Sequence, residues 1–164
     1  MFGKLFSKAK EKEITVFAPL SGEARSLEQV PDPMFAQKVI GDGVAIQPSE
    51  GILVAPAKGK IVHVATTLHA IGLVTDEGLE ILCHIGIDTV KMDGQGFTSY
   101  VKAGDTVNLG DKLISFDLQL IESAGYATIT PIIITNGDKV AANNQVTQGN
   151  VQAGRDHIMK INLK

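Results

Sequence analysis

Short apolar runs separated by turn residues follow one another along this chain and predict β-strands. The clearest runs are Ile14 to Phe17, Ala70 to Val74, Leu79 to Cys83, Thr130 to Asn136 and Ile158 to Leu163. Several of them are rich in Ile, Val and Thr, whose branched side chains favour strands. The pattern therefore predicts an all-β fold.

Helical spacing occurs in only two places of the chain body, so one or two short helices are expected. Met34 to Lys38 has room for one helical turn after Pro31 and Pro33, which exclude a regular strand there. Asp117 to Ala124 has helical spacing of apolar residues, with Asp117 as its N-cap.

The N-terminal residues 1–13 differ from the body in their pattern. Phe2, Leu5, Phe6 and Ala9 recur at helical spacing among lysines. Two alternatives stay open: an amphipathic helix that makes a peripheral membrane contact, and a flexible solvated tail. Residues 14–164 contain no linker and are predicted to form a single domain.

An Ala-Pro-x-x-Gly pattern occurs twice, beginning at Ala18 and at Ala55, each time between two apolar runs. It favours an internal duplication in which two similar halves fold together. The alternative is that both copies are ordinary Pro/Gly turns.

The central stretch from Thr67 to Val90 holds two of the four histidines. A turn centred between Asp76 and Glu77 would pair His69 directly with His84 on antiparallel strands. Paired side chains lie about 4.5–5.5 Å apart at Cβ and point to the same face, so this register predicts that the two imidazoles meet. Neither His63 nor His157 has a second histidine in register with it, and both are interpreted as structural.

Composition narrows the classes of function. The 164 residues suit one domain, and the formal charge of −3 gives no basic surface for nucleic acid. The single cysteine cannot form an internal disulfide, which fits a reducing compartment. Since no apolar run reaches about 18 residues and no signal peptide is evident, a cytoplasmic location is expected.

Several catalytic classes lack the residues that they need. Cys83 should point away from the face of His84, so it is predicted to be a buried core residue and not a nucleophile. A mononuclear zinc hydrolase would need a third ligand, and a glycosidase would need a carboxylate partner for Asp88.

Two facing histidines with one acid nearby fit phosphoryl transfer better. One neutral imidazole would attack the phosphoryl donor while the other donates a hydrogen bond to the phosphoryl oxygens. Carbonyl groups in the turn from Ile85 to Ile87 are candidates for fixing the tautomer of the attacking ring.

The same residues resemble a known family. The matching segments are Pro31-Asp32, Phe35 to Lys38, Gly41 to Ile46, Leu68 to Ala70, Cys83 to Val90, Gly94 to Phe97, Gly110-Asp111, Phe116 to Leu118 and Thr130-Pro131. Together they are similar to the glucose-type IIA component of the bacterial sugar phosphotransferase system. The resemblance covers nearly everything after residue 14, and it implies a compact antiparallel β-sandwich, barrel-like in form, with a duplicated hybrid motif.

The resemblance also implies a reaction and its residues. A member of this family is a phosphotransferase component that accepts a phosphoryl group from the carrier protein HPr and passes it to a cysteine of a IIB domain or IICB permease. His84 matches the phosphorylated position, His69 its partner and Thr67 the hydroxyl that binds this partner. The carbonyl at Gly86 orients the active ring, and Asp88 lies nearby.

The last expectation from the resemblance is a docking rim for the partners. The resemblance implies that an apolar rim receives both partners, and this rim is made by Met34, Phe35, Val39, Ile40 and Val90. Ala65 and Gly72 are small where some relatives carry aromatic residues, which leaves partner choice open.

Two alternatives to a transport phosphocarrier stay open. The first is a regulatory binding module whose phosphorylation state is read by other proteins, and the second is a zinc peptidase of similar duplicated architecture. No cofactor is required for phosphoryl transfer. His69 and His84 could hold zinc only with a further ligand from a partner.

Overall fold

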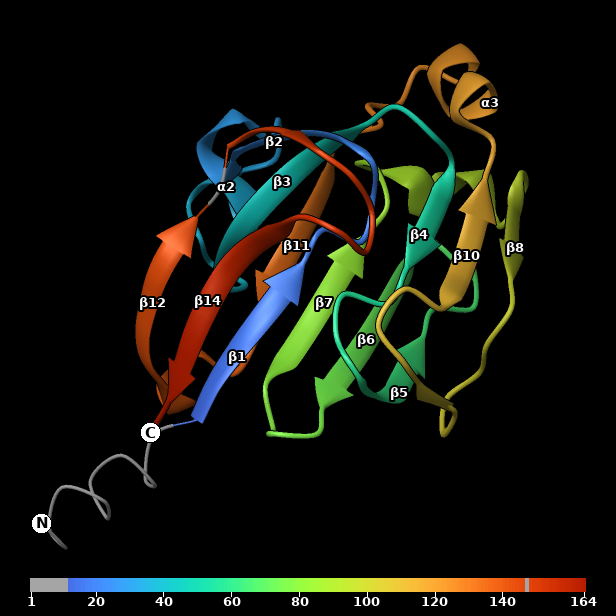
Figure 1. Ribbon diagram of the computed structural model, residues 1–164. Coiled ribbons are helices and arrows are strands. Elements are labelled where there is room, and N and C mark those ends of the chain that lie inside the picture. The colour runs from blue at the N-terminus through green and yellow to red at the C-terminus, as the bar shows by residue number, and fades with distance from the viewer. Residues whose placement is uncertain (1–11, 147) are drawn as a thin grey trace, which may run out of the picture.

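The computed structural model describes residues 12–146 and 148–164 and consists mostly of strands (Figure 1). The helical elements are short, as predicted, and an all-β fold is confirmed. The strands are β1 (Lys12–Phe17), β2 (Gly22–Ser26), β3 (Asp42–Pro48), β4 (Ile52–Val54), β5 (Gly59–Val64), β6 (Ala70–Thr75), β7 (Glu80–His84), β8 (Phe97–Ser99), β9 (Thr106–Val107), β10 (Lys112–Phe116), β11 (Thr130–Ile134), β12 (Val140–Val146), β13 (Gly149–Val151) and β14 (His157–Leu163). The helical elements are η1 (Leu27–Gln29), α2 (Pro33–Ala36), η2 (Thr89–Met92), α3 (Leu118–Ser123) and η3 (Gly137–Lys139).

The described strands form one large sheet and two small ones. The large sheet has the order β13-β2-β3-β11-β7-β6-β5-β9, and the small sheets have the orders β1-β14-β12 and β4-β10-β8. In Figure 1 the sheet β1-β14-β12 lies at the left and the sheet β4-β10-β8 at the right. All of the strand pairs are antiparallel within the described residues.

The two Ala-Pro turns are held together by a reciprocal pair of hydrogen bonds. The amide of Phe17 donates to the carbonyl of Pro56 at 2.9 Å, and the amide of Val54 donates to the carbonyl of Pro19 at 2.8 Å. Both bonds thus join equivalent positions of the two copies. The strand order of the large sheet also divides into two matched halves, which meet at the β11–β7 pair. The structure therefore supports an internal duplication and not two unrelated turns.

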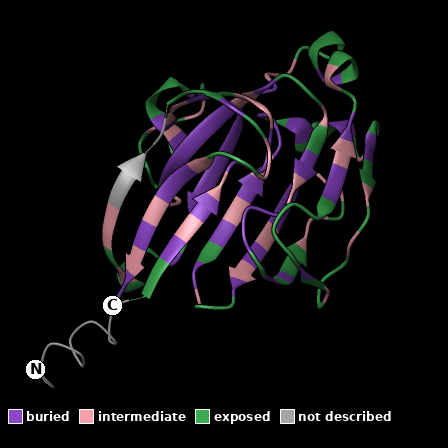
Figure 2. Cartoon of the chain, in the orientation of Figure 1, coloured by how far each residue is buried: buried purple, intermediate pink, exposed green. Residues whose placement is uncertain are grey.

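Strand alternation builds the main core between the large sheet and the small sheets. Figure 2 shows buried and less buried residues alternating along several strands. In β6 the side chains of Ile71 and Leu73 are buried, whereas Gly72 and Val74 lie on the opposite, outer face of the large sheet. A second, smaller cluster covers part of this outer face and consists of Leu27, Val30, Phe35, Ala45, Ile87, Ile129 and Ile133.

Both predicted helices form, and each begins after an aspartate that caps its N-terminus. Asp32 caps α2 by accepting a hydrogen bond from the amide of Met34 at 2.9 Å, and Pro33 occupies the first turn, where a missing N–H costs nothing. Asp117 caps α3 in the same way through the amide of Leu120 at 3.1 Å. Because α2 is so short, its segment serves mainly to place Phe35 over the outer face of the large sheet.

The chain body begins earlier than predicted. Lys12 and Glu13 belong to β1 and pair with Leu163 and Asn162 of β14, so the strand starts two residues before Ile14. The rest of the predicted N-terminal tail, residues 1–11, lies outside the described residues. The C-terminus lies beside the start of β1 (Figure 1). Across the part that is described, no helix has the length and apolar character to cross a membrane.

Candidate functional site

The hairpin of β6 and β7 forms as predicted, but its register differs by one residue. Ala70, not His69, pairs with His84, and Val74 pairs with Glu80. The predicted direct pairing of His69 with His84 is therefore wrong. Its cause lies in the turn between these strands.

The turn is longer than the predicted one because Gly78 adds a residue to it. Gly78 has φ +103°, a conformation that favours glycine, and the amide of Thr75 donates to the carbonyl of Leu79 at 2.9 Å. Asn136, which lies between β11 and η3, fixes this turn: its side chain accepts from the amide of Glu80 and donates to the carbonyl of Gly78, each at 2.9 Å. The register is thus set by a glycine conformation and a distant asparagine.

The two imidazoles meet although the predicted register is wrong. The ring centroids of His69 and His84 lie 5.0 Å apart, with an interplanar angle of 79°. His69 precedes β6 and follows Leu68, whose φ of +61° breaks the strand geometry. Its carbonyl still accepts from the amide of Ile85 at 2.7 Å. Because the backbone turns at Leu68, the His69 side chain reaches the face of His84 from outside the regular ladder.

Cys83 points into the main core, as predicted from strand alternation. It is 2% exposed, and burial raises the pKa of its thiol to about 12. The thiolate, which is the nucleophilic form of cysteine, is therefore strongly disfavoured at neutral pH. With Cys83 excluded, the histidines are the candidate nucleophiles on the outer face of the large sheet.

The ring of His84 is held by the carbonyl of Gly86. Its Nδ1 lies 2.7 Å from this oxygen, which can only accept a hydrogen bond, so Nδ1 carries the proton and Nε2 keeps the free lone pair. Gly86 has φ +70°, and a Cβ at this position would lie 2.7 Å from the carbonyl oxygen of Ala127 and from Cγ2 of Thr89. Only glycine fits the turn that aims this carbonyl.

His69 is held by a hydroxyl group. Its Nδ1 lies 2.5 Å from Oγ1 of Thr67, two residues earlier in the chain. This contact occupies Nδ1, which leaves Nε2 of His69 as the nitrogen available to the site. The three residues Thr67, His69 and His84 that the resemblance implied are therefore brought together.

Both histidines are biased toward the neutral imidazole. Burial lowers the pKa of His84 even though the Gly86 hydrogen bond and the charges of Asp32 and Asp88 act to raise it. Burial also lowers the pKa of His69, and the nearby His84 and His63 lower it further. A neutral ring has the lone pair that nucleophilic attack requires.

The lowered pKa values predict how stability depends on pH. Below the usual histidine pKa of 6.5 the unfolded chain binds more protons than the folded chain, so stability present above that pH is lost on acidification. We expect the urea midpoint to fall between about pH 7.5 and about pH 5, and to fall less in His84→Gln. His157→Gln is the matched control and should keep the wild-type slope. A wild-type midpoint that rises on acidification would contradict the prediction.

Two acidic residues flank His84, and only one of them was predicted. Asp88 is exposed, has φ +62° and precedes η2. Asp32, which sequence reasoning placed only in a loop, caps α2 and exerts a larger effect on the pKa of His84 than Asp88 does. Pro31 and Pro33 excluded a regular strand there, but no local signal identified Asp32 as a cap or placed α2 beside β7.

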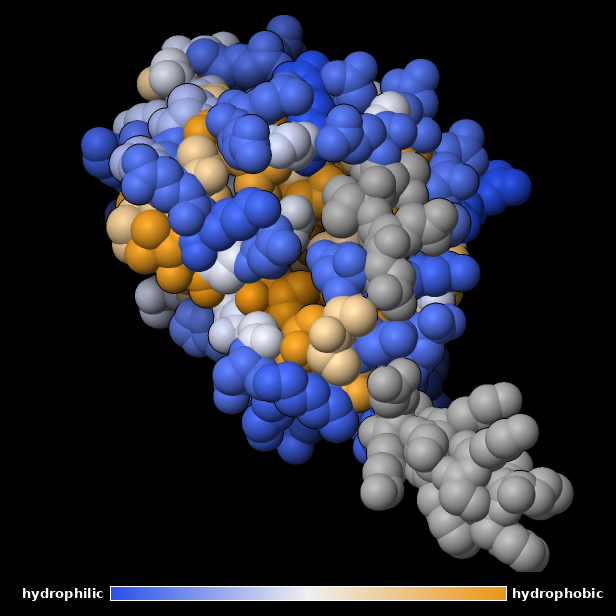
Figure 3. Space-filling model, turned by 90° about the vertical axis from the view of Figure 1, so that its left-hand side faces the viewer, coloured by the Kyte–Doolittle hydropathy of each residue, from blue (hydrophilic) through white to orange (hydrophobic). Residues whose placement is uncertain are grey.

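The predicted apolar rim is only partly exposed. Met34, Val39 and Val90 are 48%, 61% and 49% exposed, whereas Phe35 is 4% exposed and packs its ring against His84 with centroids 5.0 Å apart. Ile40 is half-buried and packs on the smaller cluster. Phe35 is thus a wall of the histidine site and not a projecting rim residue. Figure 3, which views the molecule from the side of α2 and β12, shows apolar patches among polar atoms.

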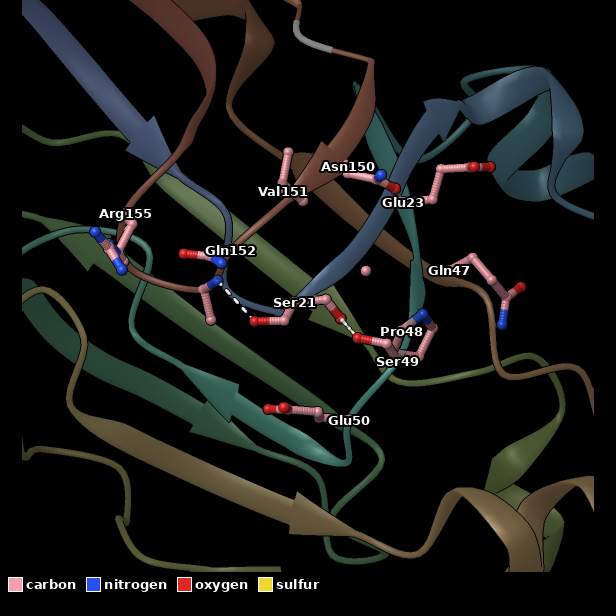
Figure 4. A pocket seen from close by; sticks show the side chains of 12 residues that line it. Ser21, Glu23, Gln47, Pro48, Ser49, Glu50, Asn150, Val151, Gln152 and Arg155 are labelled. Carbon is pink, nitrogen blue, oxygen red and sulfur yellow. Dashed lines mark hydrogen bonds between the residues drawn. The ribbon is translucent and has the colours of Figure 1, made fainter.

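A polar hollow of about 680 Å³ lies away from the histidines, where the start of β2, the end of β3 and β13 come together (Figure 4). Its own serines are already engaged: the hydroxyl of Ser21 accepts from the amide of Ala153, and that of Ser49 donates to the carbonyl of Ser21. In Figure 4 the side chains of Gln47 and Arg155 point away from its centre. The hollow therefore lacks the convergent reactive groups that the histidine site has.

Metal-binding groups are sparse among the residues that the structure describes. No set of three or more His, Cys, Asp or Glu side chains is arranged to hold a metal ion there. His69 and His84 by themselves provide two nitrogen ligands, which is fewer than the three that a catalytic zinc site takes from protein.

Comparisons with known proteins point to one family. A family model described as phosphoenolpyruvate-dependent sugar phosphotransferase system, EIIA 1, matches residues 14–140. The chain is 47% identical over 165 residues to the PTS system glucose-specific EIIA component of Bacillus anthracis, and the match covers 100% of both chains. It is 50% identical over 167 residues to the component of the same name from Bacillus cereus, again over 100% of both.

A solved structure agrees with these matches. The glucose permease IIA from Mycoplasma capricolum superposes with a TM-score of 0.86 and 39% sequence identity, covering 91% of this chain and 96% of that chain. The same arrangement of strands is therefore present in both proteins.

Proposed function

Because this chain belongs to the EIIA 1 family of the phosphoenolpyruvate-dependent sugar phosphotransferase system, a family of phosphocarriers in sugar uptake, we propose that Nε2 of His84 receives and releases the phosphoryl group. The observation that carries this proposal is the 2.7 Å bond from Nδ1 of His84 to the carbonyl of Gly86. It leaves Nε2 as the one ring nitrogen with a free lone pair.

In the accepting step a phosphohistidine of HPr is the donor. The bond between its ring nitrogen and phosphorus breaks as the bond from Nε2 of His84 to phosphorus forms, and the donor nitrogen takes back its electron pair. No proton has to leave His84, because the attacking nitrogen carries none. In the onward step the bond from Nε2 to phosphorus breaks as a cysteine thiolate of a IIB domain forms a sulfur–phosphorus bond.

His69 supports both steps through its other nitrogen. When the Thr67 hydroxyl donates to Nδ1, the proton of His69 resides on Nε2, from which it can bind a phosphoryl oxygen. Negative charge in the transition state lies largely on these oxygens. A donor that is already in place stabilises them more strongly in a site shielded from water, and Phe35 shields the His84 ring.

The surroundings of the histidines fit docking of two partners in turn. The exposed side chains of Met34, Val39 and Val90 offer apolar contact beside the site, and Phe35 and Ile40 support them from beneath. HPr and a IIB domain or IICB permease are the partners that the family implies. The glucose-specific names of the relatives support a glucose-type permease as the onward partner. They do not favour a mainly regulatory module.

The direct test is to find where the phosphoryl group resides. The full chain is incubated with labelled phosphoenolpyruvate, enzyme I and HPr, and the labelled peptide is identified. We expect an acid-labile label on His84 alone. A label on any other residue would overturn the assignment.

Zinc binding is a secondary proposal, which rests on the two facing imidazoles. We propose that His69 and His84 hold zinc only when a partner adds a carboxylate, so that zinc would join two proteins and take no part in phosphoryl transfer. We expect zinc alone to bind the isolated chain weakly, with a Kd in the range of about 10 μM or above, and more weakly still after His69→Gln. Tight binding in calorimetry of the isolated chain would contradict the need for a partner.

A further inference from the structure

His63 lies on β5, on the outer face of the large sheet that also carries the histidine site. It is exposed, and the β5–β6 register shifts between Ile61 and His63. His63 pairs with Gly72 of β6, and Gly72 pairs in turn with Leu82 of β7. These three residues form one row across the sheet, and Ala70 and His84 belong to the next row that points to the same face, two residues along the strands.

Gly72 leaves the path between His63 and the histidine pair open. A Cβ on Gly72 would lie 3.6 Å from Cβ of His63, so a larger residue at position 72 would stand beside the His63 side chain. The diagonal neighbour of His63 on β6 is Ala70, and such neighbours lie about 7–8 Å apart, so His63 lies on the side of the site where His69 directly precedes Ala70. The charge of His63 already acts on His69, where it helps to lower the pKa.

We propose that the imidazolium form of His63 supports phosphoryl transfer by stabilising the phosphoryl group held between His84 and His69. This inference rests on the proposed role of His84. A phosphoryl group on a ring nitrogen brings two negative charges into a partly buried site, and a cation on the same face of the sheet attracts it. The unphosphorylated chain has no such charge, so His63 favours the phosphorylated state over the free state.

Two other charged groups on the same face provide a matched control. Lys60 of β5 and Glu80 of β7 both pair with Val74, in the row beyond Gly72 and closer to the turn. Lys60 thus carries the same sign of charge on the same strand, one row farther from the site. Neutralising it should affect the phosphoryl group much less.

The test measures how the phosphoryl group divides at equilibrium between HPr and this chain. We expect His63→Gln to lower the phosphorylated-to-free ratio of the chain by about three- to tenfold, and His63→Lys to keep it at or above the wild-type ratio. Lys60→Gln should change it by less than about twofold. The effect of His63→Gln should shrink as salt rises, because a charge effect through solvent is screened.

Each outcome separates the two proposals. An unchanged ratio in His63→Gln, with the label still on His84, would overturn the role of His63 and leave that of His84 intact. An equal loss in His63→Gln and His63→Lys would also overturn it, since the shape of the side chain and not its charge would then matter. If the wild-type chain carried no label on His84, that result would instead refute the proposed function itself.

Discussion

We expect the His84→Ala chain to accept no phosphoryl group from phospho-HPr. The variant removes Nε2, the nitrogen that the Gly86 carbonyl keeps free for attack. Cys83 cannot replace it, because this residue points into the core and burial raises the pKa of its thiol to about 12. His69 cannot replace it either when Thr67 donates to its Nδ1, since its Nε2 then carries the proton. Labelling should fall by more than about a thousandfold, as expected when a covalent nucleophile is lost.

His157→Ala is the control for this variant. His157 lies on β14 and pairs with Phe17 in a small sheet, remote in topology from β7, so label transfer should stay at the wild-type rate. Thermal unfolding of both variants checks that the fold is intact. Persistent label in a folded His84→Ala chain would show that another residue accepts the phosphoryl group.

We expect the His69→Gln chain to be phosphorylated on His84 but to pass the phosphoryl group on about a hundred to a thousand times more slowly. The Gly86 carbonyl orients His84 without help from His69, so the accepting nucleophile stays in place. In the onward step the nucleophile is an anionic thiolate that approaches an anionic phosphoryl group. A donor that can become positively charged relieves this repulsion, and glutamine cannot become charged.

The two half-reactions can be measured separately. Single-turnover transfer from phospho-HPr should slow by less than about tenfold in His69→Gln, whereas transfer from the purified phosphorylated variant to a IIB domain should nearly stop. Thr67→Val should show a weaker form of the same pattern, because it removes only the hydroxyl that orients His69. Sugar phosphorylation at the wild-type rate in His69→Gln would exclude His69 from the mechanism.

The hairpin shows why two facing imidazoles were predicted correctly from a wrong register. The spacing of the apolar runs placed β6 and β7 beside each other, and strand alternation placed Cys83 in the core. The predicted turn, however, assumed that Thr75 faces Gly78. The conformation of Gly78 moves the pairing by one residue, and the left-handed Leu68 brings His69 back to the face of His84. Neither dihedral angle is fixed by periodicity.

The sequence by itself determined the local elements of this protein and the residue types of its site. Apolar alternation predicted the strands, Asp117 was identified as a helix cap, and the motif around His84 identified the family. These features depend on contacts between residues close in the chain, which a pattern can record.

Only the tertiary structure decided how distant segments meet. It buried Phe35 against His84, brought Asp32 close enough to act on that ring, and placed His63 in the row beside the site. It also fixed the hairpin turn through Asn136, far along the chain. Packing, burial and electrostatic effects of this kind depend on distances between segments, and those distances exist only once the sheets have assembled.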